Sequence, residues 1–242
     1  HSFNYTNYLY RPRRPEELDT SRGGGILFNQ VPHQIDTARL LGGGLVRSVR
    51  AHTSALDPAR PTEAGCAALL QFEGGGAASL VYSGYDHFDS DEWHFGISER
   101  GSPKKTDHGA ARRTLAKAED ETRARTETFA YGASAGGLPP HQPHFGITIV
   151  TCADGDMRAS ADGVTIYGPD GMREFSIPRG GSMPGRREVL DEMRAAIRIG
   201  RKSVHDGRWA KATVEVALAI LRSAREGREI ALEHQVAVTG ER

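Results

Sequence analysis

The sequence predicts an α+β fold in which helices pack on one face of an open, predominantly antiparallel β-sheet. Three observations lead to this class. Short apolar runs of strand length follow one another with only turns between them, Asp-Gly steps at 154–155, 162–163 and 170–171 mark tight turns, and two amphipathic helical patterns stand near the end of the chain. Strands and helices do not alternate, so no Rossmann domain is expected in this chain.

A helix is the first regular element that the pattern predicts. Residues 1–22 are polar, aromatic and rich in Arg and Pro, which indicates an irregular entry segment. Pro32 suits the first turn of a helix, where its missing N–H costs nothing. An apolar stripe at helical spacing runs from Ile35 to Leu41, and Gly42 ends it.

Strands account for much of the remaining sequence. A first group contains a hairpin with its turn at 73–76, and a second group follows the middle of the chain. In chain order the predicted strands are Val46–Thr53, Ala67–Phe72, Ala77–Tyr82, Trp93–Ile97, Phe145–Cys152, Met157–Ser160, Val164–Tyr167, Arg173–Ile177 and Glu229–Glu233.

A polar segment at about 98–144 interrupts the strands. It holds few large apolar residues and one charged helical stretch near Leu115–Thr128, so it is interpreted as an insertion and not as a separate domain. Two amphipathic helices are predicted at Arg187–Ile199 and Trp209–Arg225. Residues 1–242 are therefore expected to form a single α+β domain with one insertion.

Charge and hydropathy argue against several kinds of partner. The 242 residues include 31 Lys plus Arg and 31 Asp plus Glu, and this zero net charge argues against a nucleic-acid binder. No apolar run approaches the roughly 18 residues that a membrane span needs. Cys66 and Cys152 lie in strand-like runs and are interpreted as buried reduced thiols, which fits a cytoplasmic protein.

Glycine clusters do not form a nucleotide-binding loop. The sequence contains no G-x-G-x-x-G that follows a strand, and no G-x-x-x-x-G-K-[ST]. We therefore predict no cofactor-binding residues in this chain.

Asn29 and His33 stand one helical turn apart at the start of the predicted helix. Histidine can carry a proton near neutral pH, and the free N–H groups of a helix start favour an anion nearby. Asn29 can hold a substrate hydroxyl or orient the imidazole. A cap or a buried polar histidine is the structural alternative, and spacing alone leaves both open.

Two other polar groups are candidates. Residues 85–94 crowd carboxylates and imidazoles, but they show no recognised metal-binding spacing, so no metal site is predicted. His94 is instead a candidate substrate contact, with a solvated loop as the alternative. In the insertion, Arg112 and Arg113 suit a carboxylate through bidentate hydrogen bonds, with a solvated flap as the alternative. His141 and His144 face a site or are ordinary loop residues.

Two stretches resemble one enzyme family. Residues 23–36 read Gly-Gly-Gly-Ile-Leu-Phe-Asn-Gln-Val-Pro-His-Gln-Ile-Asp. They resemble the motif G-G-G-x-L-x-D-x-G-x-H-x-[IL]-D of the glucose–fructose oxidoreductase / inositol dehydrogenase (Gfo/Idh/MocA) family. Residues 214–232, with a Ser-Ala-x-x-Gly ending to the helix, look like that family's closing helix and last strand. The resemblance covers 23–97 and 145–233 in the family's order.

The resemblance implies the C-terminal, substrate-binding and oligomerisation domain of an NAD(P)-dependent oxidoreductase. The N-terminal dinucleotide-binding domain, which binds most of NAD or NADP in that family, is absent from this chain, and the fragment alone is expected to be inactive. A homo-oligomer formed through the sheet is expected, with a small molecule as the substrate.

The resemblance also assigns roles to individual residues. The motif histidine falls on His33, which would act as general acid/base on the substrate carbinol. The motif aspartate falls on Asn29, which cannot take a proton and would position the substrate, and the motif glycine is Val31. Asp36 matches the second motif aspartate and is expected at the substrate with Gln30 and Gln34.

The motif looks most like the branch of 4,5-dihydroxyphthalate dehydrogenases, which act on a cyclic dihydrodiol. Basic residues of the insertion would suit a dicarboxylate substrate. A sugar or inositol dehydrogenase is the alternative within the family, and a catalytically silent binding or assembly domain is the alternative outside the enzyme class.

Overall fold

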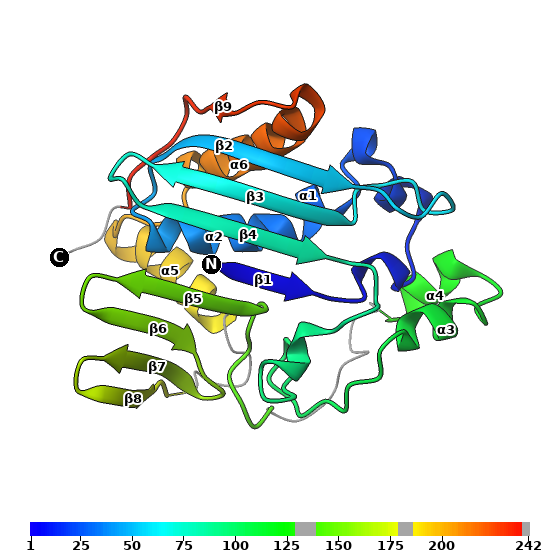
Figure 1. Ribbon diagram of the computed structural model, residues 1–242, viewed down its shortest axis with the longest axis horizontal. Coiled ribbons are helices and arrows are strands. Elements are labelled where there is room, and N and C mark those ends of the chain that lie inside the picture. The colour runs from blue at the N-terminus through cyan, green and yellow to red at the C-terminus, as the bar shows by residue number, and fades with distance from the viewer. Residues whose placement is uncertain (129–138, 179–185, 239–242) are drawn as a thin grey trace.

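A computed structural model describes residues 1–128, 139–178 and 186–238. Their strands form one sheet in the order β8-β7-β6-β5-β1-β4-β3-β2-β9 (Figure 1). Every neighbouring pair is antiparallel except β1 and β4, which run parallel. The strands are β1 (Ser2–Tyr5), β2 (Val46–Ser54), β3 (Gly65–Phe72), β4 (Ala77–Ser83), β5 (Ile147–Cys152), β6 (Gly155–Ala159), β7 (Gly163–Gly168), β8 (Gly171–Ser176) and β9 (Ile230–Ala231).

Helices cover one face of this sheet, which confirms the predicted α+β class. In Figure 1, α1, α2, α5 and α6 lie behind the strands, and α3 and α4 stand beside one end of them. The helices are α1 (Ile26–Asn29), α2 (Val31–Leu41), α3 (Ala110–Leu115), α4 (Glu121–Thr128), α5 (Arg186–Ile199) and α6 (Gly207–Glu226).

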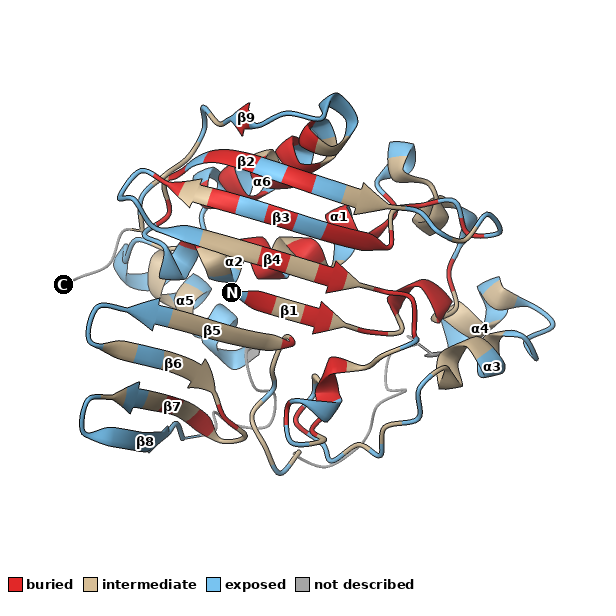
Figure 2. Cartoon of the chain, viewed as in Figure 1, coloured by how far each residue is buried: buried red, intermediate tan, exposed pale blue. Residues whose placement is uncertain are grey.

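The core lies between α2, α6 and the central strands. Buried Ile35 of α2 and Ile220 of α6 pack in one cluster with Val49, Leu70 and Leu80 of β2, β3 and β4. Buried residues alternate with exposed ones along β2 and β3 (Figure 2), as expected for a sheet with one covered face. This packing fixes α2, and with it His33, over the middle of the sheet.

The prediction of an irregular segment at 1–22 is wrong at its beginning. Ser2–Tyr5 forms β1, which lies between β4 and β5, and three short 3₁₀ helices follow it. The buried positions of β1 are polar: Ser2 accepts a hydrogen bond of 3.0 Å from Gln34 Nε2, and Asn4 is 1% exposed. Since these side chains replace the usual apolar ones, the strand has no hydrophobic alternation to predict it.

The predicted strand Trp93–Ile97 is also wrong. Ser90–Glu92 is a 3₁₀ helix that is capped by the Asp89 side chain, and a turn follows it. Phe95 and Gly96 have φ of 58° and 67°, which a strand does not allow. The apolar residues of this segment lie in the compact turn and form no strand.

Three smaller expectations need correction. The helix predicted near 115–128 begins later, as α4 at Glu121, where the Asp120 carboxylate accepts from the Arg123 amide, and α3 ends at Leu115 before it. Cys66 is buried as predicted, but Cys152 is exposed at the end of β5. The closing strand is shortened to β9.

Gly146 lies directly before β5 in a conformation that only glycine adopts easily. Its φ is 70°, and an added Cβ would meet the Phe3 carbonyl oxygen and Asn4 Cβ, the latter at 2.8 Å. We expect Gly146→Ala to lower the free energy of unfolding by about 1–3 kcal/mol in urea titration. Gly74→Ala is the control, since nothing lies within 4 Å of its added Cβ. An equal small loss in both variants would contradict this.

Candidate functional site

The junction of α1 and α2 presents three candidate polar side chains. α1 ends at Asn29 and α2 begins at Val31 with Pro32 in its first turn, which leaves Asn29 and His33 exposed. Gln30 Nε2 donates to Asn29 Oδ1 at 2.6 Å. The sequence-predicted residues Asn29, Gln30 and His33 are therefore brought together at one end of α2.

Strand residues anchor this junction to the sheet. The Tyr82 hydroxyl lies 3.4 Å from Gln30 Oε1 and 2.8 Å from Thr6 Oγ1. Burial raises the pKa of Tyr82 well above its usual value, so the hydroxyl keeps its proton and donates. This series of contacts holds Gln30, and through it Asn29, in place.

Two aromatic rings, of Phe145 and Tyr82, lie on one side of His33. The His33 and Phe145 rings are 5.2 Å apart, and the Phe145 and Tyr82 rings are 6.4 Å apart. No hydrogen bond to the His33 imidazole occurs among residues 1–128, 139–178 and 186–238. The imidazole is thus available to an outside group, next to an apolar surface on which a ring can pack.

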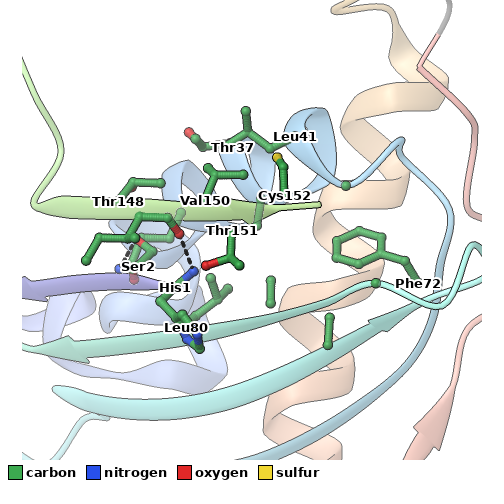
Figure 3. A pocket seen from close by; sticks show the side chains of 17 residues that line it. His1, Ser2, Thr37, Leu41, Phe72, Leu80, Thr148, Val150, Thr151 and Cys152 are labelled. Carbon is green, nitrogen blue, oxygen red and sulfur yellow. Dashed lines mark hydrogen bonds between the residues drawn. The ribbon is translucent and has the colours of Figure 1, made fainter. Parts of the chain in front are cut away.

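Two ligand-sized cavities lie between α2 and the sheet. We name the first one the ring cavity. It has a volume of about 340 Å³ and a mostly apolar lining, which includes Gln34, Thr37, His144, Phe145 and Met157. A second cavity of about 250 Å³ lies between β4 and β5. Figure 3 shows the second one, with Thr37 and Leu41 projecting from α2 and Leu80 from β4. Gln34 lines both.

Gln34 and Asp36, two polar residues of α2, contact different parts of the molecule. Gln34 is 2% exposed and donates to Ser2 Oγ at 3.0 Å and to the Val81 carbonyl at 3.2 Å. Asp36 points to α6 instead, where it accepts from Trp209 Nε1 and from Thr213 Oγ1. The structure therefore brings Gln34 to the cavities and gives Asp36 partners away from them.

His94 and His144 form a buried pair at the border of the ring cavity. Their rings are 3.9 Å apart, and His94 is 2% exposed. His144 Nε2 donates to the Ile97 carbonyl at 2.8 Å and lies 3.5 Å from Asp91 Oδ1. Burial raises the pKa of Asp91, against the opposing hydrogen bond of 2.7 Å from Lys104. The segment at 85–94 is thus packed, not a solvated loop, at these positions.

The pKa of His94 predicts an acid-sensitive fold. Burial, and after it the charges of His144, Arg158 and His141, lowers this pKa to about 4 from 6.5. The folded state therefore binds the proton more weakly than the unfolded state, so this stabilisation is complete above about pH 6.5 and is lost as the pH falls through 4. We expect the urea midpoint to fall over this range, and to fall less in His94→Phe. An unchanged slope in that variant would contradict the assignment; His52→Phe, at an exposed site, is the control.

The arginines of the insertion lie at a different place. Arg112 packs its guanidinium 3.6 Å from the Tyr10 ring centre and donates to the Tyr85 carbonyl at 2.8 Å. It lines a hollow that shares no lining residue with the cavities at α2. Arg113 is paired with Asp107 at the surface. The structure does not bring these two residues to His33.

The sequence interpretation missed several residues of the site. Thr6, Thr37, Tyr82 and Phe145 were not singled out, and His144 was left open as a loop residue. Their only shared property is that they converge from distant parts of the chain. Tyr82 carries a weak signal, because a tyrosine at an inward-facing strand position needs a polar partner for its hydroxyl.

The described residues contain neither a metal-binding cluster nor a membrane-spanning helix. No three His, Cys, Asp or Glu side chains within them are grouped so as to hold a metal ion. Their helices include none with the length and hydropathy to cross a membrane.

Fold and site together define an α+β domain with an open sheet, a helix-borne histidine and adjoining cavities. Residues 1–99 match the GFO/IDH/MocA C-terminal domain. Over these residues the chain therefore carries the sequence of a GFO/IDH/MocA C-terminal domain.

Similar proteins agree with this family. A 1-carboxy-3-chloro-3,4-dihydroxycyclohexa-1,5-diene dehydrogenase of Comamonas testosteroni is 38% identical over 236 residues, which is 93% of this chain and 58% of that protein. A structure from Bordetella bronchiseptica RB50, of a protein assigned as a dehydrogenase, is 48% identical with a TM-score of 0.90, over 96% of this chain and 61% of that one. The chain thus spans about three fifths of these relatives.

More distant structures share the fold. An oxidoreductase from Agrobacterium radiobacter, in complex with NAD+, L-tartaric acid and magnesium, is 14% identical with a TM-score of 0.57 over 95% of this chain and 55% of that one. An aldose-aldose oxidoreductase from Caulobacter crescentus is 17% identical with a TM-score of 0.58 over 96% and 54%.

Proposed function

We propose that this chain is the substrate-binding part of an NAD(P)-dependent dehydrogenase that oxidises a hydroxylated six-membered ring, such as the dihydrodiol of a benzoate or phthalate. The observation that carries the proposal is His33, an exposed imidazole beside the Phe145 ring and next to the ring cavity. The 38% identity to a dehydrogenase of a chlorinated dihydroxycyclohexadiene carboxylate supports this substrate class.

His33 moves the proton in this proposal. When bound, NAD or NADP supplies the acceptor for a hydride from the carbinol carbon. The carbinol C–H bond breaks with its electron pair, the hydroxyl proton passes to the His33 imidazole, and a C=O bond forms. Asn29 and His33 are exposed at the end of α2, which leaves room for a nicotinamide from a part of the protein outside this chain.

The neighbours of His33 orient the substrate. The amides of Asn29 and Gln30 can both donate and accept, so they suit the hydroxyls of a diol. Asn29 takes no proton, which leaves His33 as the proton acceptor of the pair. His94 packs against His144 at the border of the ring cavity. Asp36, Arg112 and Arg113 have structural roles through the contacts described above.

A silent binding or assembly domain is the second candidate, because Asn29 stands where the family motif has aspartate. Asn29→Asp separates the two. In a working dehydrogenase this variant changes the rate and pH dependence of an activity that is already present. In a silent domain the wild-type protein has no dehydrogenase activity that Asn29→Asp could alter.

A panel of substrates tests the proposal. The full-length protein is mixed with NAD or NADP and with a dihydroxycyclohexadiene carboxylate, myo-inositol or glucose, and the absorbance of reduced nicotinamide is followed. We expect turnover with the diol carboxylate. Turnover only with inositol or glucose would contradict the proposed substrate class. No turnover with any of them would contradict the proposal that the protein is a dehydrogenase.

We further propose that two copies pair through the open face of the sheet, as the resemblance to the family implies, in a cytoplasmic protein. Leu69 is 42% exposed on this face, in a shallow hollow with Arg50 and His52. We expect Leu69→Arg to convert the full-length oligomer to a smaller species in analytical ultracentrifugation, because it places a charge in the contact. An unchanged sedimentation coefficient would contradict this face as the interface.

A further inference from the structure

α5 is an amphipathic helix whose apolar side is exposed. Val189, Met193 and Ile197 repeat every four residues and Leu190 lies beside them, so the four side chains form one stripe along the helix. Their exposed fractions lie between 52% and 75%. A surface helix normally turns such a stripe toward a core, and a contiguous exposed apolar patch marks a place of interaction. We call these four residues the α5 stripe.

Polar contacts hold α5 by a different side. Glu192 accepts from Ser203 Oγ at 2.5 Å and from the Val204 amide at 2.8 Å, and it lies 2.9 Å from His205 Nδ1. The hydrogen bonds with Ser203 and His205 lower the pKa of Glu192 to about 2. Within the described residues, every hydrogen bond and ion pair that leaves α5 ends between Arg201 and His205. α5 is thus fixed through its polar side, which leaves the α5 stripe exposed.

The α5 stripe belongs to the same face of the molecule as His33. Figure 1 shows α5 behind the strands, together with α2 and α6. His205, the partner of Glu192, has its Nε2 atom 4.0 Å from Asp36 Oδ2. Asp36 follows His33 by three residues on α2, which is about one helical turn. A body that covers α5 therefore lies on the helix-covered face, where His33 is also exposed.

The part of the protein outside this chain fits this position. The chain spans 58% of the dehydrogenase from Comamonas testosteroni and 61% of the structure from Bordetella bronchiseptica, so about two fifths of each relative is unmatched. The proposed function, on which the choice of this occupant rests, needs that part to bring a nicotinamide to His33. Two copies, in contrast, are proposed to pair through the opposite, open face at Leu69.

We infer that the α5 stripe docks the nucleotide-binding part of the full-length protein. Apolar side chains of that part pack against Val189, Met193 and Ile197, and this contact removes exposed apolar surface from water. The docked part is then held on the face that carries His33. α5 thereby gains a role in placing the nicotinamide, although it contributes no residue to the candidate active site.

Photo-cross-linking in the full-length protein tests the inference without turnover. The variants are Met193→p-benzoylphenylalanine and Ile197→p-benzoylphenylalanine, and the control carries the same probe at Arg198, an exposed residue of the polar side. Mass spectrometry identifies the joined peptides after irradiation. Both stripe probes are expected to join, within one chain, a peptide from outside residues 1–242. The probe at Arg198 is expected to join none above background.

A charge in the contact gives an independent readout. In the full-length protein, Met193→Glu is expected to raise the hydrogen-exchange rate of the α5 amides about tenfold or more, because an unpaired buried charge separates the two parts. Arg198→Glu, on the polar side, should change this rate less than about threefold. Circular dichroism checks that each variant folds, and a probe variant that fails to fold leaves the exchange measurement to decide.

Four outcomes would overturn the inference. The stripe probes join peptides within residues 1–242 of the same chain, they join two copies in a product of twice the chain mass, they give no more product than the Arg198 probe, or both glutamate variants exchange equally. No outcome depends on oxidation. If the substrate panel shows no turnover while the probes join the outside part, the proposed dehydrogenase is contradicted and the docking surface stands. If turnover occurs while the probes join elsewhere, the docking surface is contradicted and the dehydrogenase stands.

Discussion

His33→Asn is expected to lower kcat/KM of the full-length protein for a cyclic diol by about 100- to 10,000-fold, the usual contribution of a general base. Asparagine keeps a polar side chain of similar reach, but it cannot take the hydroxyl proton. Because the His33 side chain is exposed and its hydrogen bonds with Gln30 and Thr37 are made by backbone atoms, the substitution should leave the fold unchanged. Rates of nicotinamide reduction measure the effect.

The control for this change is His234→Asn, since His234 is an exposed histidine that lines neither the cavities at α2 nor the hollow of the open face. It should retain the wild-type rate. A loss below about threefold in His33→Asn would assign the proton to another group. A parallel loss in both variants would indicate a general effect of the substitution and not catalysis.

Arg39→Met is expected to cause the largest loss of stability, about 3 kcal/mol. Arg39 is fully buried, and Nη1 donates to the Trp209 carbonyl at 3.1 Å and to Thr213 Oγ1 at 2.8 Å. Its guanidinium also stacks 3.9 Å from the Trp209 ring centre. Methionine preserves volume but leaves these partners unsatisfied in the core between α2 and α6.

Urea unfolding of Arg39→Met measures this loss. Arg47→Met is the control, because Arg47 is exposed on β2 and its removal should cost less than about 0.5 kcal/mol. Similar unfolding midpoints for both variants would contradict the structural role of Arg39. That outcome would also weaken the assignment of Asp36 to the same contact between α2 and α6, which it makes through Trp209 and Thr213.

Local patterns predict the elements of this fold better than they predict its site. Pro32 and the stripe from Ile35 to Leu41 place a helix, and hence Asn29 and His33, where the structure has them. β1 escapes prediction because Ser2 and Asn4 are polar at buried positions. Trp93–Ile97 misleads because an apolar composition does not reveal the positive φ of Phe95.

The site itself depends on long-range packing. Nothing local in the sequence brings Phe145 to His33, or His144 and Gln34 to one cavity, since strand pairing of β1 with both β4 and β5 sets these distances. The arginines of the insertion show the converse. Arg112 suits a carboxylate by residue type, but packing directs it to Tyr10 and the Tyr85 carbonyl.

A single-turnover measurement tests the central claim most directly. The full-length protein and its His33→Asn variant, each with bound oxidised cofactor, are mixed rapidly with saturating dihydroxycyclohexadiene carboxylate, and reduced nicotinamide is followed in the first turnover. The account predicts one equivalent formed per wild-type site and a rate at least about 100-fold slower in the variant. Equal rates, or no reduced nicotinamide in wild type, would contradict it.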